Sequence, residues 1–203
     1  MLKVLFVVAL AAAVSAALGR QTDVAFVDTY DDIPAIVGVP DLNPIGLYHG
    51  IIYAGASVSN RPANTRGIAP SSGQNVAIAE IRADLLDLGE VSLRPFATLT
   101  RSHNVTSFDL LSLFFGFTIS TGTSLTGVPI SGTLTVVGYR LDGTSVEEQF
   151  DFTPTGLLNA PPSKAVLSNK FTYLQNVTIA SPVTLVSVDT TISFDNLTHI
   201  NRY

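Results

Sequence analysis

The chain has 203 residues, of which only 13% are charged, and its formal net charge is −5. Its basic residues are scattered, which argues against nucleic acid and anionic membranes as partners, because both require clustered lysine and arginine. Cysteine is absent, so the chain has no disulfide framework and no thiolate zinc site. A chain of this length can bury enough apolar surface without them.

The first 19 residues have the pattern of a secretory signal peptide. Lys3 gives a short basic start, Val4–Val14 is apolar, and Val14-Ser15-Ala16 supplies the small residues of a cleavage site. A membrane anchor is disfavoured because the apolar run is short for a bilayer and rich in alanine. We therefore expect residues 1–19 to be a signal peptide and residues 20–203 to form one soluble, secreted, extracellular domain.

The next stretches predict short strands separated by turns rich in Pro, Gly, Asn and Ser. We expect strands at Val24–Val27, within the apolar island Ile45–Val58, at Gln74–Asp84 and at Leu93–Thr100. Residues Asp84–Val91 are open to either a short helix or a loop. Further along, Thr153–Lys170 contains three prolines and is predicted to be a loop. Strands follow at Phe171–Ala180, Val183–Val188 and Ile192–Ile200.

The centre of the chain carries the clearest pattern. Phe108–Ser120 is apolar on both faces, which predicts a strand covered on both sides. Thr133–Arg140 and Ser145–Phe152 alternate as two strands of a hairpin. Between them Asp142-Gly143 predicts a type I′ turn, which needs two positive φ angles. The sequence therefore predicts an all-β fold, an antiparallel sandwich.

The order of these landmarks resembles a group of secreted, mostly fungal glycoproteins with a jelly-roll, galactose-binding-like sandwich. The matching elements are Tyr30-Asp31-Asp32-Ile33-Pro34, Gly46-Leu47-Tyr48, Ser107-Phe108-Asp109-Leu110, Leu134-Thr135-Val136-Val137-Gly138-Tyr139, Asp142-Gly143 and Phe194-Asp195-Asn196-Leu197. The resemblance spans most of the mature chain and implies a jelly-roll fold and an extracellular location. Members of the group mostly lack a defined activity. Relatives often carry Trp where this chain has Tyr48 or His49, which weakens the transfer of an aromatic ligand platform.

Four carboxylates are candidate ligands for a structural calcium ion: Asp28, Asp31, Asp32 and Asp195. Calcium takes several oxygen ligands, and we expect the first and last strands to lie side by side and to bring these residues together. The resemblance implies the same site, because a calcium ion between the terminal strands is common in jelly-roll sugar-binding modules. The alternative is a solvated acidic turn whose Asp side chains cap backbone groups.

Tyrosines are the candidates for stacking on a sugar ring, since the chain has no Trp. We expect Tyr48, Tyr53 and Tyr139 to contact a ligand; the alternative is that they are ordinary tyrosines of a sheet. N-glycosylation sequons begin at Asn104, Asn176 and Asn196.

The motifs of common enzymes are missing. The sequence contains no Gly-x-Ser-x-Gly elbow. Its three histidines, His49, His103 and His199, do not have the His-x-x-x-His spacing of a zinc site. Glu147 and Glu148 point to opposite faces of one strand and do not form the carboxylate pair of a glycosidase.

Two hypotheses of function remain. The first is a non-catalytic extracellular module that recognises a glycan or a cell-wall surface. The second is a secreted structural or host-interaction glycoprotein, similar to an effector, with no small ligand. A groove lined by tyrosines favours the first, and a large exposed apolar patch favours the second.

Overall fold

The computed structural model describes residues 22–35, 43–61, 67–80, 95–119, 127–181 and 190–203. These residues form twelve strands and no helix, so nothing in them could cross a membrane as a helix. The predicted signal peptide, residues 1–19, lies outside the described residues and stays a prediction. The assignment of residues 20–203 to one domain also stays a prediction.

The strands cover most of the described chain. They are β1 (Asp23–Asp28), β2 (Pro44–Tyr48), β3 (Ile51–Asn60), β4 (Asn75–Glu80), β5 (Phe96–Arg101), β6 (Ser107–Ile119), β7 (Val128–Ile130), β8 (Gly132–Arg140), β9 (Ser145–Phe152), β10 (Ser163–Val166), β11 (Leu174–Ala180) and β12 (Thr190–Arg202).

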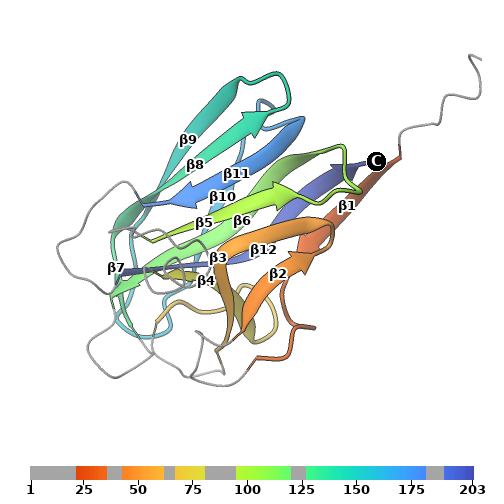
Figure 1. The fold of residues 1–203 in the computed structure, drawn as a ribbon. Coiled ribbons are helices and arrows are strands. Elements are labelled where there is room, and N and C mark those ends of the chain that lie inside the picture. Colours follow the sequence, from red (N-terminus) through yellow and green to blue (C-terminus); the bar gives the residue numbers. More distant parts are fainter. Residues whose placement is uncertain (1–21, 36–42, 62–66, 81–94, 120–126, 182–189) are drawn as a thin grey trace, which may run out of the picture.

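The strands pair along one folded path. Hydrogen bonds link them in the order β10-β6-β12-β4-β3-β5-β11-β8-β9, and β1, β2 and β7 pair with β12, β3 and β6. β4 pairs with β12 on one side and with β3 on the other, and thus joins two layers. One layer contains β10, β6, β12 and β1, and the other contains β2, β3, β5, β11, β8 and β9 (Figure 1). The predicted all-β antiparallel sandwich of jelly-roll type is confirmed.

The first and last strands are neighbours, as the sequence predicts. β1 pairs antiparallel with β12 from Asp23 opposite Arg202 to Asp28 opposite Leu197. β12 also pairs with β4 and β6, so this strand lies between other strands and not at an edge of the sheet. The acidic turn after β1 is therefore brought close to the middle of β12.

β6 is buried on both faces at Phe115–Thr118, which confirms the interpretation of its apolar sequence there, whereas Leu111 is 39% exposed. The rings of Phe115 and Phe117 point across the sandwich, with centroids 6.2 and 6.3 Å from the ring of Phe152 on β9. On the opposite face, a Cβ added to Gly116 would lie 2.7 Å from the side chain of Ile68. Burial of a phenylalanine ring contributes about 1.5–3 kcal/mol to folding, so these rings make β6 the centre of the core.

β8 and β9 form the predicted hairpin, but the turn is of another type. Gly143 has a φ of +83°, whereas Asp142 does not have a positive φ. The amide of Gly143 donates to the carbonyl of Arg140 (3.1 Å), and the amide of Arg140 donates to the carbonyl of Thr144 (2.9 Å). This is a three-residue loop, a type I turn followed by glycine in the left-handed region. The Asp142 carboxylate accepts hydrogen bonds from the backbone N–H and the hydroxyl of Thr144 at 2.9 and 2.7 Å, and these bonds favour a local Asx turn over a type I′ turn.

Two short strands lie where the sequence predicts none, namely β7 and β10. β10 lies within the predicted loop Thr153–Lys170 and pairs with β6 from Ser163 opposite Phe115. Its own residues, Ser-Lys-Ala-Val, have no strong strand pattern, so it depends on the partner strand. The island Ile45–Val58 forms β2 and the ten-residue β3. The predictions for Asp84–Val91 and Val183–Val188 lie outside the described residues.

Arg202 of β12 forms partly buried ion pairs with Asp109 of β6 and Asp23 of β1. The guanidinium of Arg202 donates to both oxygens of Asp109, at 3.2 and 2.5 Å, and to Asp23 at 2.9 Å. The Asp109 carboxylate also accepts the backbone N–H of Tyr173 at 2.9 Å, and the guanidinium lies 4.6 Å from the centroid of the Tyr173 ring. The hydrogen bond to Asp109 is the main reason that the pKa of Arg202 is raised.

Candidate functional site

The carboxylate that ends β1 is completely buried. Asp28 is 0% exposed and accepts a hydrogen bond from the hydroxyl of Tyr53. Nδ1 of His49 lies 2.7 Å from one carboxylate oxygen, and Nε2 of His199 lies 3.2 Å from the other. A buried carboxylate requires such partners, because an isolated buried charge is strongly destabilising. The partners come from β3, from β12 and from the turn after β2, so Asp28 joins the ends of these elements.

The two histidines beside Asp28 are held by other contacts. The ring of Phe26 stacks on both, with centroid distances of 4.9 Å to His49 and 5.3 Å to His199. The amide of Asn201 donates to the carbonyl of His49 at 2.7 Å, and its oxygen lies 2.9 Å from Nδ1 of His199. Because that oxygen can only accept, Nδ1 of His199 carries a proton. His199 is 0% exposed, so a ligand in solution cannot contact its ring.

Three tyrosines surround the acidic turn. The hydroxyl of Tyr48 donates to Asp32 at 2.5 Å, while Tyr30 and Tyr53 are buried, with their hydroxyl oxygens 3.5 Å apart. Burial raises the pKa of all three phenols above the ordinary value, and nearby carboxylates add to the effect. The hydroxyls therefore stay protonated and act as donors. Since Tyr53 is only 2% exposed, its ring offers no face to a sugar.

Asp31 and Asp195 hold the loop that precedes β4. Asp195 accepts the backbone N–H groups of Ser71 (2.6 Å) and Ser72 (3.0 Å), and Asp31 accepts those of Gln74 (2.9 Å) and Asn75 (3.0 Å). Burial raises the pKa of Asp195 to about 6, although the backbone N–H donors oppose this shift. The charge of Asp31 also raises this pKa. Asp195 and Asp31 therefore bind backbone N–H groups of the same loop.

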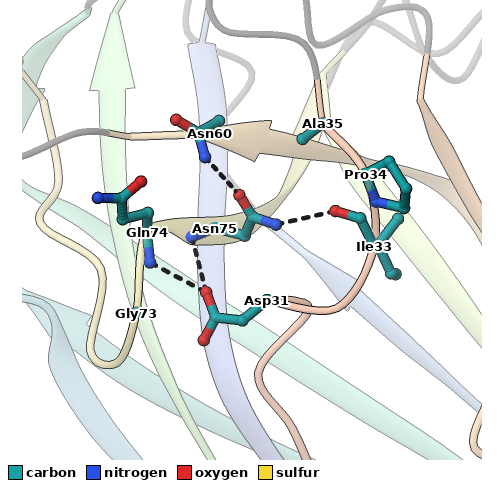
Figure 2. Close-up of a pocket in the computed structure, with 8 residues that line it drawn as sticks. All are labelled: Asp31, Ile33, Pro34, Ala35, Asn60, Gly73, Gln74 and Asn75. Carbon is teal, nitrogen blue, oxygen red and sulfur yellow. Dashed lines mark hydrogen bonds between the residues drawn. The ribbon is translucent and has the colours of Figure 1, made fainter.

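An open hollow of about 460 Å³ lies beside this loop (Figure 2). It is lined by Asp31, Ile33, Pro34, Ala35, Asn60, Gly73, Gln74 and Asn75. Figure 2 shows that the side-chain amide of Asn75 donates to the carbonyl of Ile33 and that Asn60 donates to Asn75, at 3.0 and 2.9 Å. These polar groups are bonded within the protein, and therefore the hollow is a weak candidate for a polar ligand.

The four carboxylates that the sequence nominates for calcium do not share one coordination point in this structure. Asp28 is hydrogen-bonded by His49 and Tyr53, Asp32 by Tyr48, and Asp31 and Asp195 by backbone N–H groups. Within the described residues, no group of three or more acidic, histidine or cysteine side chains is arranged to hold a metal ion. The arrangement fits the capping alternative, and the calcium site stays a prediction.

Another candidate surface lies on the layer that contains β2, β3, β5, β11, β8 and β9, and we call it the outer face. Cross-strand partners point to the same side of a sheet, and the register aligns them in rows. The first row runs across β2, β3, β5, β11, β8 and β9 and consists of Leu47, Ile52, Thr100, Asn176, Tyr139 and Ser145. The second row consists of Ala54, Thr98, Thr178, Val137 and Glu147. With about 4.8 Å between strands, the first row is roughly 24 Å long.

The outer face is partly solvent-exposed and mostly uncharged. Leu47, Ile52 and Tyr139 are 64%, 42% and 41% exposed. The outward positions of the two rows on β3, β5, β11 and β8 carry no charged side chain, and the acidic residues lie on β9 at one edge. Figure 1 shows β5, β11, β8 and β9 lying side by side in this layer. Of the tyrosines that the sequence nominates, the structure places Tyr139 on this face.

Sequence reasoning did not find the threonines of this face. Thr98, Thr100 and Thr178 each alternate with buried apolar residues, as in Ala97 and Leu99 of β5. That alternation is visible in the sequence. What it cannot give is the register that places β5 beside β11.

The three sequons lie in different surroundings. Asn104 is exposed, in the turn before β6. Asn176 is half-buried, in the first row of the outer face. Asn196 has a φ of +47°, accepts a hydrogen bond from the hydroxyl of Ser72 at 2.6 Å and donates to the hydroxyl of Ser71 at 3.4 Å. Glycosylation at these positions stays a prediction.

No protein-family model and no curated protein matches the chain. Among solved structures, family 29 carbohydrate-binding modules are similar in strand arrangement. One is 14% identical, with a TM-score of 0.42, over 90% of each chain. A variant complexed with cellulohexaose is 13% identical (TM-score 0.44, covering 88% of this chain and 91% of that chain). A variant complexed with mannohexaose is also 13% identical (TM-score 0.41, covering 90% and 93%). Similarity at this distance assigns no ligand to this chain.

Proposed function

We propose that the chain is a secreted, non-catalytic module that binds an uncharged polysaccharide, such as a cell-wall glycan, on its outer face. The observation that carries this proposal is the first row, in which an exposed tyrosine ring, an amide and a threonine hydroxyl lie side by side on adjacent strands. Secretion follows from the predicted signal peptide at residues 1–19.

The chemistry of the face suits a neutral sugar chain. The C–H face of a sugar ring packs on an aromatic plane, which Tyr139 provides, and Ile52 adds apolar surface two strands beyond Asn176. Sugar hydroxyls both donate and accept hydrogen bonds, and so do the threonine hydroxyls and the Asn176 amide. Because the outward positions of the two rows on β3, β5, β11 and β8 carry no charge, an anionic polysaccharide would gain nothing there and would meet the carboxylates of β9.

The proposal is tested with mature protein made without glycosylation, so that the outer face is bare. Retention on insoluble neutral polysaccharides and calorimetric titration with cellulohexaose and mannohexaose measure binding. Replacement of Tyr139 by Ala removes one aromatic contact of about 1 kcal/mol, which corresponds to about a five-fold weaker affinity. The matched control is Tyr203→Ala, which removes another exposed tyrosine, next to the end of β12 in the other layer.

Equal affinity of wild type and Tyr139→Ala would remove the outer face as the site. If the wild-type protein shows no retention on any neutral polysaccharide at high protein concentration, the function proposed here fails. The second hypothesis, a structural or host-interaction glycoprotein, then takes its place, with the exposed apolar residues Leu47 and Ile52 as the surface to examine.

A further inference from the structure

The second sequon lies in the middle of the outer face. Asn176 is on β11, with Tyr139 of β8 opposite on one side and Thr100 of β5 opposite on the other. Thr178, the hydroxyl residue of the same sequon, points to the same side in the second row. Adjacent strands lie about 4.8 Å apart. A sugar joined to Asn176 would therefore extend over Tyr139 or over Thr100.

The Asn176 amide is available for modification. Asn176 is partly exposed, and within the described part of the chain its side chain makes no hydrogen bond. The sequon at Asn196 is different, since its side chain bonds with Ser71 and Ser72. A glycan at Asn176 displaces no hydrogen bond of the folded protein, whereas one at Asn196 would.

We propose that Asn176 is N-glycosylated in the secreted protein and that its glycan covers the outer face and controls access to it. The control of ligand binding rests on the function proposed above, while the covering of Tyr139 does not. The glycan acts as a tethered occupant, because its sugars meet the same ring and the same hydroxyls that a free polysaccharide would meet.

The modification needs a polyprenyl diphosphate-linked oligosaccharide as donor. The amide nitrogen of Asn176 attacks the anomeric carbon of that donor. A C–N bond forms, the C–O bond to the diphosphate breaks, the polyprenyl diphosphate leaves with the electron pair, and the amide proton passes to a base of the transferase.

The test compares full-length protein secreted from a host that N-glycosylates with the same protein made without glycosylation, which keeps every side chain of the outer face. Two variants that lose the sequon, Asn176→Gln and Thr178→Ala, assign the effect on Tyr139 to this sequon. Asn104→Gln is the matched control, because it removes a sequon from an exposed turn outside the outer face. Peptide mass spectrometry gives the occupancy of Asn176. Oxidative footprinting of Tyr139 reports whether the face is covered, without any ligand. Retention on neutral polysaccharide reports access.

We expect Asn176 to be occupied and Tyr139 to be oxidised at least five-fold faster in the unglycosylated protein and in both sequon-deficient variants. Retention should rise at least ten-fold in the unglycosylated protein, and Asn104→Gln should behave as wild type. An unoccupied Asn176 overturns the proposal, as does equal oxidation of Tyr139 with and without the sequon. If Tyr139 becomes exposed and the unglycosylated protein still binds no polysaccharide, the proposed function fails and the covering stands. If all forms bind equally well, control of access is refuted.

Discussion

Replacement of Asp195 by Asn should remove part of the pH dependence of stability. Asp195 is 2% exposed, and the pKa of its carboxyl group is raised from an ordinary value of 3.8 to about 6. A folded-state pKa above the unfolded value means that the folded protein binds the proton more tightly. Protonation of Asp195 therefore stabilises the folded protein fully below about pH 3.8, and this stabilisation is lost as the pH rises through about 6.

The size of the effect follows from the shift. About two pKa units correspond to roughly 3 kcal/mol over the whole range, at 1.36 kcal/mol per unit. Between pH 7 and pH 5 the wild type should gain about 1 kcal/mol from this group, which is roughly 2–4 °C in melting temperature for a domain of this size. In Asp195→Asn the amide does not titrate, so this gain disappears. One oxygen that accepts backbone N–H groups is also lost, which lowers stability at every pH.

The assay is thermal unfolding followed by circular dichroism at pH 5, 6 and 7. The quantity of interest is the difference between pH 5 and pH 7 within each protein, because the lost hydrogen bond cancels in that difference. Glu147→Gln, which neutralises an exposed carboxylate on β9, is the control and should keep the wild-type pH dependence. An unchanged pH dependence in Asp195→Asn would show that another group is responsible and that burial of Asp195 has no energetic consequence.

Three further perturbations have expected outcomes. Asp109→Asn should cost about 2–4 kcal/mol in urea unfolding because it leaves the partly buried Arg202 without its main partner, and the double variant with Arg202→Met should lose less than the sum of the single variants. Gly143→Val should cost about 1 kcal/mol or more in thermal unfolding, since φ is +83° with no atom within 4 Å of an added Cβ. Gly156→Val, with no positive φ, should be close to neutral. Calcium binding at the predicted acidic site should raise the melting temperature and Asp195→Ala should abolish the rise, whereas equal melting temperatures in EDTA and in calcium would remove that site.

The sequence predicted the parts of the fold that local chemistry determines. The apolar run of β6 and the β8–β9 hairpin were predicted from patterns a few residues long. The pairing of β1 with β12 was predicted from a different argument, that the terminal strands of a sandwich are exposed unless they pair. The predicted turn type was wrong because the Asp142 carboxylate accepts hydrogen bonds from Thr144, which favours an Asx turn. The Asp-Gly pair alone does not reveal this contact. β10 was missed because four residues with weak strand preference form a strand only against the edge of β6.

The candidate sites were harder to predict because they depend on register and depth. The sequence places Asp28 in an acidic cluster, but only the fold shows that it is buried between His49 and His199. Likewise, nothing local distinguishes Tyr53, which is buried, from Tyr139, which is exposed. The outer face is made of residues from six strands, and its rows exist only when all six strands are aligned.

The central position of β12 has a consequence for how the protein is made. β1, β4 and β6 all pair with a strand that follows every other described strand in the chain. Synthesis adds roughly 5–20 residues per second, so for seconds after β1 emerges these three strands have no partner along one edge. Unpaired edges are prone to join other chains. Chaperone protection during synthesis should therefore matter more for this protein than for a sandwich whose central strands are made first.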